Sequence, residues 1–168
     1  MTPQLSEVCL QERFAPASIC FGCGPANAEG LHVRSFTVDE DSDEVVARWR
    51  AEPRHQAFEG VVNGGIIGTL LDCHSNWAAA WHLKRRDRLT RPPVTVTASF
   101  EVRLRKPTPI DRPVELHARA TASEGAKVQV EAELTSGGEV TATCIGRFVA
   151  VKPDHPAYHG WPTDADPA

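Results

Sequence analysis

The chain has 168 residues and a formal net charge of −4. This length favours a single domain, which at roughly 150 residues buries about 68–70% of its unfolded surface and needs no disulfide or metal to fold. The weak negative charge gives no basic surface for nucleic acid or anionic lipid, and no apolar run approaches the ~20 residues that span a bilayer.

The first residues, MTPQLSEVCLQER, are polar and partly acidic and lack the apolar core of a secretory signal. The chain also contains an odd number of cysteines, scattered without a repeating pattern. We therefore expect reduced thiols and a cytoplasmic protein. The cysteines are Cys9, Cys20, Cys23, Cys73 and Cys144.

Residues 1–19 are polar and without sustained periodicity, which predicts an arm or a short helix. Residues 20–30, CFGCGPANAEG, are rich in Gly, Pro and Asn and indicate an ordered loop. We expect a strand over 31–38, an acidic turn over 39–43 and a second strand over 44–50. The apolar face of the second strand consists of Val45, Ala47 and Trp49.

A long helix is predicted to begin at Gly64, with Asn63 as its N-cap. Apolar residues recur at helical spacing along it. We expect the helix to end before a charged turn over 84–88. Its apolar face consists of Ile66, Ile67, Leu70, Leu71, Trp77, Ala78 and Trp81.

Beyond the helix the pattern changes to alternation with period two, which predicts four strands in an antiparallel meander. Turn signals at 106–112, 123–126 and 136–138 separate these strands. A sheet with one apolar face needs cover, and the long helix is the only candidate to provide it. The buried face of the first strand is expected to be Val94, Val96, Ala98, Phe100, Val102 and Leu104.

These elements predict an α+β fold, in which a curved antiparallel sheet of about six strands wraps around one long central helix. The predicted domain covers 20–152. It is preceded by the arm over 1–19 and followed by a tail over 153–168 that is rich in Pro, Asp and His.

The start of the helix combines two features that suit acyl chemistry. The turn Asn63-Gly64-Gly65 leaves backbone N–H groups free at the positive end of the helix dipole, where they attract a carbonyl oxygen that gains negative charge. Asp72 follows on the apolar face, and a carboxylate there is costly unless it faces a cavity, is paired or is used. The alternatives are a capped tight turn and a surface aspartate.

Three separated segments carry a resemblance to a known family: CFGCGPANAEGLHV, GVVNGGIIGTLLD and VTASFEVRLRKPTP. Over about residues 20–151 the chain resembles the hotdog-fold acyl-coenzyme A (acyl-CoA) thioesterases of the phenylacetate-pathway type. The resemblance implies a hydrolase of acyl-CoA thioesters that needs no metal and no cofactor beyond the coenzyme A of its substrate. It also implies a homodimer with a shared sheet, or a homotetramer made of two such dimers.

The resemblance assigns roles to individual residues. Asp72 would act as general base, or as a nucleophile that forms a mixed anhydride. The N–H of Gly65, together with that of Gly64, would polarise the thioester oxygen, and Thr97 would position the water or the carboxylate. Gly64 and Asp72 are separated by eight positions, about 12 Å along a helix, so one carbonyl cannot meet both on the same helix. We therefore expect two subunits to supply them.

Two positions depart from the family pattern. The family usually has His where this chain has Asn63, which can cap a helix and donate a hydrogen bond but cannot become a cation. Ala57 stands where the family often has an amide, and His55 or Gln56 is the alternative there.

The remaining candidates concern the substrate. An aromatic side chain such as Phe58 would shape an acyl pocket or belong to the core, and Asn76 lies one helical turn beyond Asp72, within reach of a hydrogen bond to it. Two basic side chains on the long strand would contact coenzyme A phosphates or lie on a solvated face. The candidate substrate-binding residues are His55, Gln56, Phe58, Asn76, Arg103 and Arg105.

Two further features are assigned to structure. Cys20 and Cys23 form a C-x-x-C, but zinc would need two more ligands, of which His32 is one candidate without a second pair, and a redox motif would need a βαβ setting. The sequence therefore favours neither a metal nor a redox role. His74 is expected in packing or at an interface.

One rival function stays open. A non-catalytic acyl-CoA-binding or scaffold protein would use the same hotdog fold, because a fold does not determine function. A hotdog dehydratase or hydratase is disfavoured, since it needs a catalytic His paired with a carboxylate and the helix start offers none.

Overall fold

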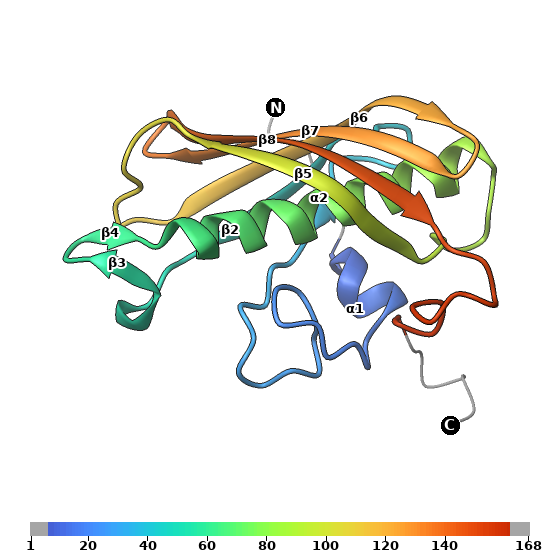
Figure 1. Cartoon of the computed structure of the whole chain (residues 1–168), viewed down its shortest axis with the longest axis horizontal. Helices are drawn as coiled ribbons and strands as arrows, with labels where there is room; N and C mark the ends of the chain where they lie inside the picture. Colours follow the sequence, from blue (N-terminus) through green and yellow to red (C-terminus); the bar gives the residue numbers. More distant parts are fainter. Residues whose placement is uncertain (1–6, 162–168) are drawn as a thin grey trace.

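The computed structural model describes residues 7–161. One six-stranded antiparallel sheet curves over the long helix α2 (Gly64–Arg86), in the order β1-β2-β6-β7-β8-β5 (Figure 1). This arrangement confirms the predicted α+β fold with one central helix. The strands are β1 (Phe36–Thr37), β2 (Val45–Trp49), β5 (Thr95–Leu104), β6 (Val114–Glu124), β7 (Lys127–Ser136) and β8 (Glu139–Ala150).

Four short elements complete the described chain. The sequence did not predict the small hairpin at the start of α2, whose turn places Gly60 at a φ of +81°. A residue with a Cβ is strained in that conformation, which explains the glycine. The four elements are α1 (Leu10–Phe14), η1 (Pro53–His55), β3 (Gln56–Phe58) and β4 (Val61–Val62).

Helix α2 begins as predicted but ends later. Asn63 is its N-cap, and its apolar face lies in the core with Leu70, Leu71 and Trp81 fully buried. The helix continues to Arg86 rather than ending before the charged turn, because the basic residues there are good helix formers and their charges suit the negative end of the helix dipole. In the part of the chain that the structure describes, no helix has the length and hydrophobicity to cross a membrane.

The N-terminal segment covers the side of α2 that the sheet leaves open (Figure 1). Leu10 and Val33 from this segment are buried against the core. His74 of α2 is fully buried, with Nδ1 at 2.8 Å from Ser35 Oγ and Nε2 at 2.9 Å from the carbonyl of Val45. His74 therefore joins the helix to the N-terminal segment and to β2, which confirms its assignment to packing. Burial lowers the pKa of His74 to about 4, so the ring is neutral.

The predicted meander is correct for β6, β7 and β8 and wrong for β5. Strand β5 pairs with β8 at the edge of the sheet, so β5 and β6 are not neighbours and the chain must cross β8 and β7 between them. The long connection over 105–113 makes this crossing possible. Alternation along β5 predicts a strand but carries no information about its partner.

The predicted buried face of β5 is also wrong, because a β-bulge changes the face part-way along the strand. Thr97 is opposite Phe148 and Ser99 is opposite Arg147, which leaves Ala98 as an extra residue. Before the bulge, Thr95 and Thr97 face α2, and after it the even-numbered residues do. The apolar residues Phe100 and Leu104 nevertheless remain 46% and 57% exposed, because this edge of the sheet is uncovered.

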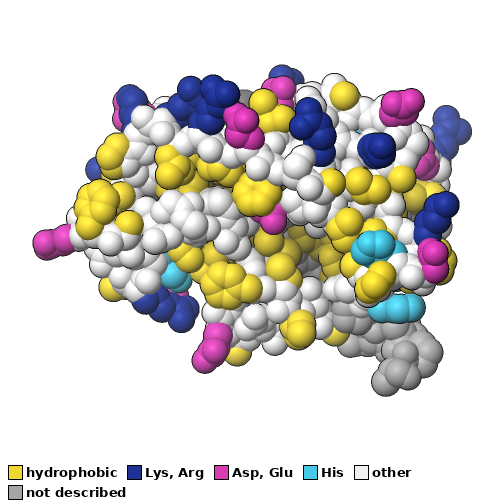
Figure 2. All heavy atoms as spheres, viewed as in Figure 1, with side chains coloured by type: hydrophobic (Ala, Val, Ile, Leu, Met, Phe, Trp, Pro, Cys, Tyr) yellow, Lys and Arg dark blue, Asp and Glu magenta, His cyan; other side chains and the backbone are white. Residues whose placement is uncertain are grey.

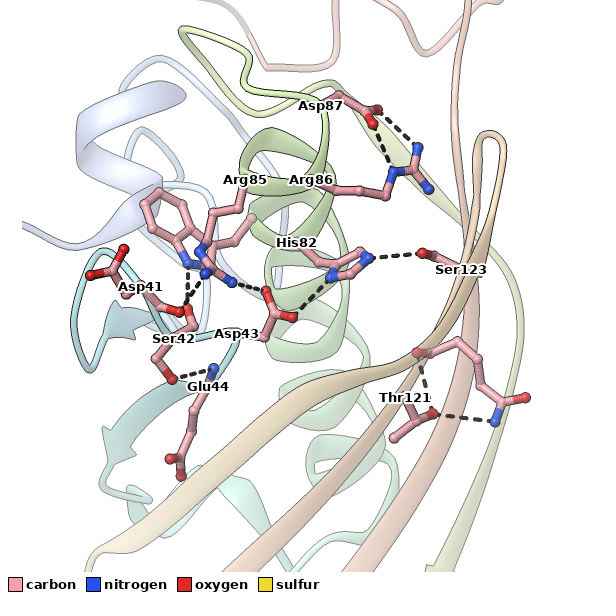
Figure 3. Close-up of polar contacts among 12 residues, drawn as sticks. Asp41, Ser42, Asp43, Glu44, His82, Arg85, Arg86, Asp87, Thr121 and Ser123 are labelled. Atoms are coloured by element: carbon pink, nitrogen blue, oxygen red, sulfur yellow. Dashed lines mark hydrogen bonds and ion pairs between the residues drawn. The ribbon is translucent and has the colours of Figure 1, made fainter.

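The acidic turn over 39–43 lies against the last turns of α2 (Figure 3). His82 and Arg85 both contact the carboxylate of Asp43, and the indole N–H of Trp81 donates to the carbonyl of Ser42 at 3.0 Å. These contacts fix the turn that leads into β2. The strand predicted over 31–38 is reduced to β1, because residues 31–35 pack as irregular chain beneath α2.

The chain on either side of the predicted domain also contacts the core. Helix α1 lies within the predicted arm, and Trp161 stacks on Trp77 with ring centroids 4.0 Å apart. Residues 1–6 of the predicted arm and 162–168 of the predicted tail lie outside the described residues.

Candidate active site

The carboxylate of Asp72 is held by a hydroxyl group on the neighbouring strand. Thr97 Oγ1 donates a hydrogen bond of 2.7 Å to Asp72 Oδ1, and both side chains are only partly exposed. The β5 bulge makes this contact possible, since Thr97 would otherwise point away from α2 when Phe100 points toward it. The structure thus brings together two residues that are 25 positions apart.

The surroundings of Asp72 raise its pKa. Burial is the main cause, because a less solvated carboxylate resists ionisation. The hydrogen bond from Thr97 acts in the opposite direction, and negative charge on Cys20 raises the pKa further. A carboxylate with a raised pKa is a stronger base at neutral pH than a free aspartate.

With the role that the resemblance implies for Asp72, Thr97→Val is expected to slow thioester hydrolysis on the order of tenfold or more, because it removes a hydrogen bond to a charged group worth about 1.5–3 kcal/mol. Thr97→Ser keeps the hydroxyl and is expected to retain most of the activity. Steady-state kcat on the best thioester checks both variants. Equal loss in the two would mean that the methyl group, not the hydroxyl, matters.

Of the two N–H groups expected to polarise the substrate at the helix start, one is engaged by the cap and the other is not. Asn63 Oδ1 accepts hydrogen bonds from Gly65 N at 2.8 Å and from Ile66 N at 3.3 Å. The N–H of Gly65, expected to polarise the substrate, is thus engaged by the cap. Among residues 7–161 the N–H of Gly64 meets no acceptor, which leaves it available to a ligand.

Asn76 does not make the hydrogen bond expected with Asp72. Its Nδ2 donates to the carbonyl of Thr95 at 3.1 Å, and Thr95 Oγ1 donates to the carbonyl of Asn76 at 3.3 Å. Asn76 therefore joins α2 to the start of β5. Its Oδ1 is buried without a partner in the described part of the chain.

Three candidates lie shortly before α2, with His55 at the end of η1 and Gln56 and Phe58 in β3 of the hairpin. His55 Nδ1 accepts the N–H of Glu52 at 2.9 Å, and burial lowers the pKa of His55. Gln56 donates to the carbonyl of Pro53 at 2.8 Å and accepts the N–H of Gly60 at 2.7 Å. The side chain of His55 thus caps η1 and that of Gln56 shapes the hairpin, whereas that of Phe58 is 66% exposed and makes no such bond.

The two candidate arginines lie on the outer face of the sheet. Arg103 bonds to Glu101 at 2.8 Å, and Arg105 donates to Thr143 Oγ1 at 3.3 Å. After the bulge, the odd-numbered residues of β5 face away from α2. The structure therefore does not bring Arg103 and Arg105 together with Asp72 in one chain.

The sequence missed a cluster of three thiols beside Asp72. The sulfur atoms of Cys20, Cys23 and Cys73 lie within 4.8 Å of one another. Only the C-x-x-C was a visible signal, since Cys73 arrives from a helix far along the chain. His32, the ligand considered from sequence, bonds to the carbonyl of Asn27 instead and is not part of the cluster.

Comparison with known proteins identifies the family. The model of the thioesterase superfamily matches residues 59–143, which include α2, Asp72 and Thr97. The chain belongs to the thioesterase superfamily. No curated protein matches the chain.

Solved structures in the thioesterase superfamily share the fold. A member from Shewanella loihica is 26% identical with a TM-score of 0.60, over 76% of this chain and 98% of that one. Another member is 24% identical with a TM-score of 0.65, and there the match covers 79% of this chain but only 60% of the other. A phenylacetic acid degradation-related protein from Ralstonia eutropha is 19% identical with a TM-score of 0.63, over 77% and 92% of the two chains.

Proposed function

We propose that this protein is an acyl-CoA thioesterase that hydrolyses a thioester to a free acid and coenzyme A. The observation that carries the proposal is the Asp72 carboxylate, partly buried and held by Thr97 at 2.7 Å, within a thioesterase superfamily fold. A buried carboxylate with a raised pKa suits the removal of a proton from water.

Two routes use the same carboxylate. As general base, Asp72 removes a proton from water while the oxygen attacks the thioester carbon, and the tetrahedral intermediate then expels the thiolate. As nucleophile, Asp72 attacks the carbon itself, coenzyme A leaves, and water hydrolyses the mixed anhydride. In both routes the hydroxyl of Thr97 orients the carboxylate.

The negative oxygen of the intermediate needs a donor, and we assign this role first to the N–H of Gly64. Its hydrogen is not engaged by the Asn63 cap, and it lies at the positive end of α2. Gly65 can contribute only if Asn63 releases it. Because Gly64 lies about 12 Å along the helix from Asp72, the donor belongs to a second subunit.

The uncovered edge of the sheet provides a surface for that second subunit. Apolar side chains gather over β5 and the start of α2 on the face shown in Figure 2. A Cβ on Gly64 would lie 2.9 Å from Leu104 Cδ1, so the exposed apolar residues of β5 adjoin the helix start. We propose a homodimer that pairs along this edge, with a homotetramer as the larger assembly.

Phe100→Glu is expected to shift the protein from dimer to monomer, because it places a charge in the proposed interface. Phe100 is 46% exposed, and Leu89→Glu, at a residue 41% exposed beyond the other end of α2, is the control that is expected to leave the assembly intact. Light scattering after size-exclusion chromatography measures the mass. A wild-type monomer would contradict the shared site.

Substrate recognition would use the remaining candidates at the mouth of this shared site. Arg103 and Arg105 are positively charged and lie on β5, the edge strand. From there they would face the neighbouring subunit and bind the phosphates of the coenzyme A held at its site. The exposed ring of Phe58 would contact the acyl group, on a hairpin that Gln56 holds in shape and that follows the short helix capped by His55. The five free cysteines suit a reducing cytoplasm.

The test is release of free thiol from a panel of aromatic and aliphatic acyl-CoA esters. Hydrolysis of at least one ester by the wild-type protein supports the proposal. No hydrolysis of any ester would overturn it. In that case, binding of the same esters measured by calorimetry would support the rival, a non-catalytic acyl-CoA-binding or scaffold protein. The engagement of Gly65 by Asn63 favours this rival.

A further inference from the structure

The thiol cluster beside Asp72 has the dimensions of a metal site. The sulfur atoms of Cys20 and Cys73 are 3.8 Å apart, and all three sulfur atoms lie within 4.8 Å. In a tetrahedral zinc site with Zn–S bonds of about 2.3 Å, neighbouring sulfur atoms are about 3.8 Å apart. The three side chains therefore need little movement to surround one ion.

The loop that carries two of the thiols is shaped around the cluster. The N–H of Gly24 donates to the carbonyl of Cys20 at 2.8 Å, which closes the C-x-x-C-G turn. The N–H of Leu31 donates to the carbonyl of Phe21 at 2.7 Å, and the N–H of Val33 donates to the carbonyl of Gly22 at 3.0 Å. These backbone hydrogen bonds hold the loop that carries Cys20 and Cys23 in one conformation.

Glycine allows this loop to lie directly on α2. A Cβ on Gly22 would lie 2.3 Å from the sulfur of Cys73, and one on Gly24 would lie 2.4 Å from the N atom of Cys20. Both positions therefore exclude a larger residue. The close approach brings the Cys73 sulfur into the group.

A buried donor points to the same place. The indole N–H of Trp77, a residue 1% exposed, has no acceptor of ordinary geometry in the described structure. Trp77 lies one helical turn after Cys73 on the same face of α2. A buried N–H without a partner is costly, and a metal-bound thiolate is a better acceptor than a neutral thiol.

We propose that Cys20, Cys23 and Cys73 bind one zinc ion as thiolates, with the fourth position open to water or to an external ligand. The three thiols release their protons on binding. Because Cys20 is exposed while Cys23 and Cys73 are buried, the open position lies on the side of Cys20. The ion fixes the N-terminal loop to α2 at the residue that follows Asp72.

The experiment measures zinc in the full-length protein, purified under reducing conditions without chelator. One zinc per chain is expected, and cobalt(II) added to the metal-free protein is expected to give thiolate-to-cobalt charge-transfer absorption. Cys144→Ser, at a buried cysteine outside the cluster, is the matched control and keeps the metal. Cys73→Ser, and Cys20→Ser at the exposed position, each weaken zinc binding by at least about 100-fold.

Circular dichroism establishes that each variant is folded before its zinc is counted. The exposed position of Cys20 keeps the test decisive if Cys73→Ser does not fold. A folded, reduced wild-type protein with neither zinc nor cobalt absorption would overturn the proposal. So would equal zinc in the Cys20→Ser protein, or a disulfide between Cys20 and Cys73 in the purified wild type. None of these readouts depends on thioester hydrolysis.

Discussion

Asp72→Asn is expected to slow thiol release from the best acyl-CoA ester by at least ~100-fold, the usual scale for loss of a general base. The amide has nearly the shape of the carboxylate, so its contact with Thr97 and its packing on α2 are retained. It can neither accept a proton from water nor attack the thioester carbon. The loss should therefore fall on kcat, which initial rates at saturating substrate measure.

Asp154→Asn, at an exposed carboxylate far along the chain, is the matched control and is expected to keep the wild-type rate. The melting temperature of each protein separates loss of chemistry from loss of folding. A stable Asp72→Asn protein with the wild-type kcat would show that hydrolysis does not use this carboxylate. The proposed mechanism would then be wrong, although the thioesterase activity would stand.

Gly64→Pro is expected to reduce kcat/KM by about 10²–10³-fold, the effect of removing one oxyanion donor. Proline lacks the N–H and is accepted at the first position of a helix, and the ψ of 134° at Asn63 suits the residue before proline. Gly64→Ala is the matched control, because it adds a Cβ and keeps the N–H. The added Cβ meets only the end of the flexible Leu104 side chain, at 2.9 Å.

The comparison between the two variants isolates the N–H group. A Gly64→Ala protein that is active beside an inactive Gly64→Pro protein supports the donor role. Equal activity in the two would assign the oxyanion to another donor, and Gly65 released from Asn63 would be the next candidate.

Mixing the two inactive variants tests whether the site is shared. In heterodimers of Asp72→Asn with Gly64→Pro, one of the two sites is intact, so random pairing in a symmetric dimer is expected to restore about a quarter of wild-type activity. Co-expression ensures that subunits mix. No recovery in verified heterodimers would mean that one chain supplies both groups, which the distance along α2 argues against.

The parts that the sequence predicted depend on local pattern. Asn63 as cap, Gly64 as first helical residue and the alternation of β6 to β8 follow from propensities within a few positions. The pairing of Thr97 with Asp72 could be expected only through the family resemblance. The resemblance supplied the residues, whereas the hydrogen bond between them depends on tertiary structure.

The parts that the sequence did not predict depend on which segments meet. Nothing near Cys73 indicates that a loop 50 positions earlier in the chain will bring Cys23 to its sulfur. Asp72 lies within helical reach of Asn76, but packing against β5 gives Asn76 the carbonyl of Thr95 as its partner instead.

The extra residue in β5 has a consequence for sequence alignment. A strand without Ala98 would place Thr97 and Phe100 on one face by simple alternation, as the folded chain does with the bulge. In a comparison with a relative that lacks the bulge, a gap at Ala98 aligns the two hydroxyl positions correctly. An alignment without this gap shifts the residues before the bulge by one position. Thr97 is then compared with a residue on the opposite face of the relative's strand. The hydroxyl that bonds to Asp72 in this chain would then seem lost in a relative that retains it.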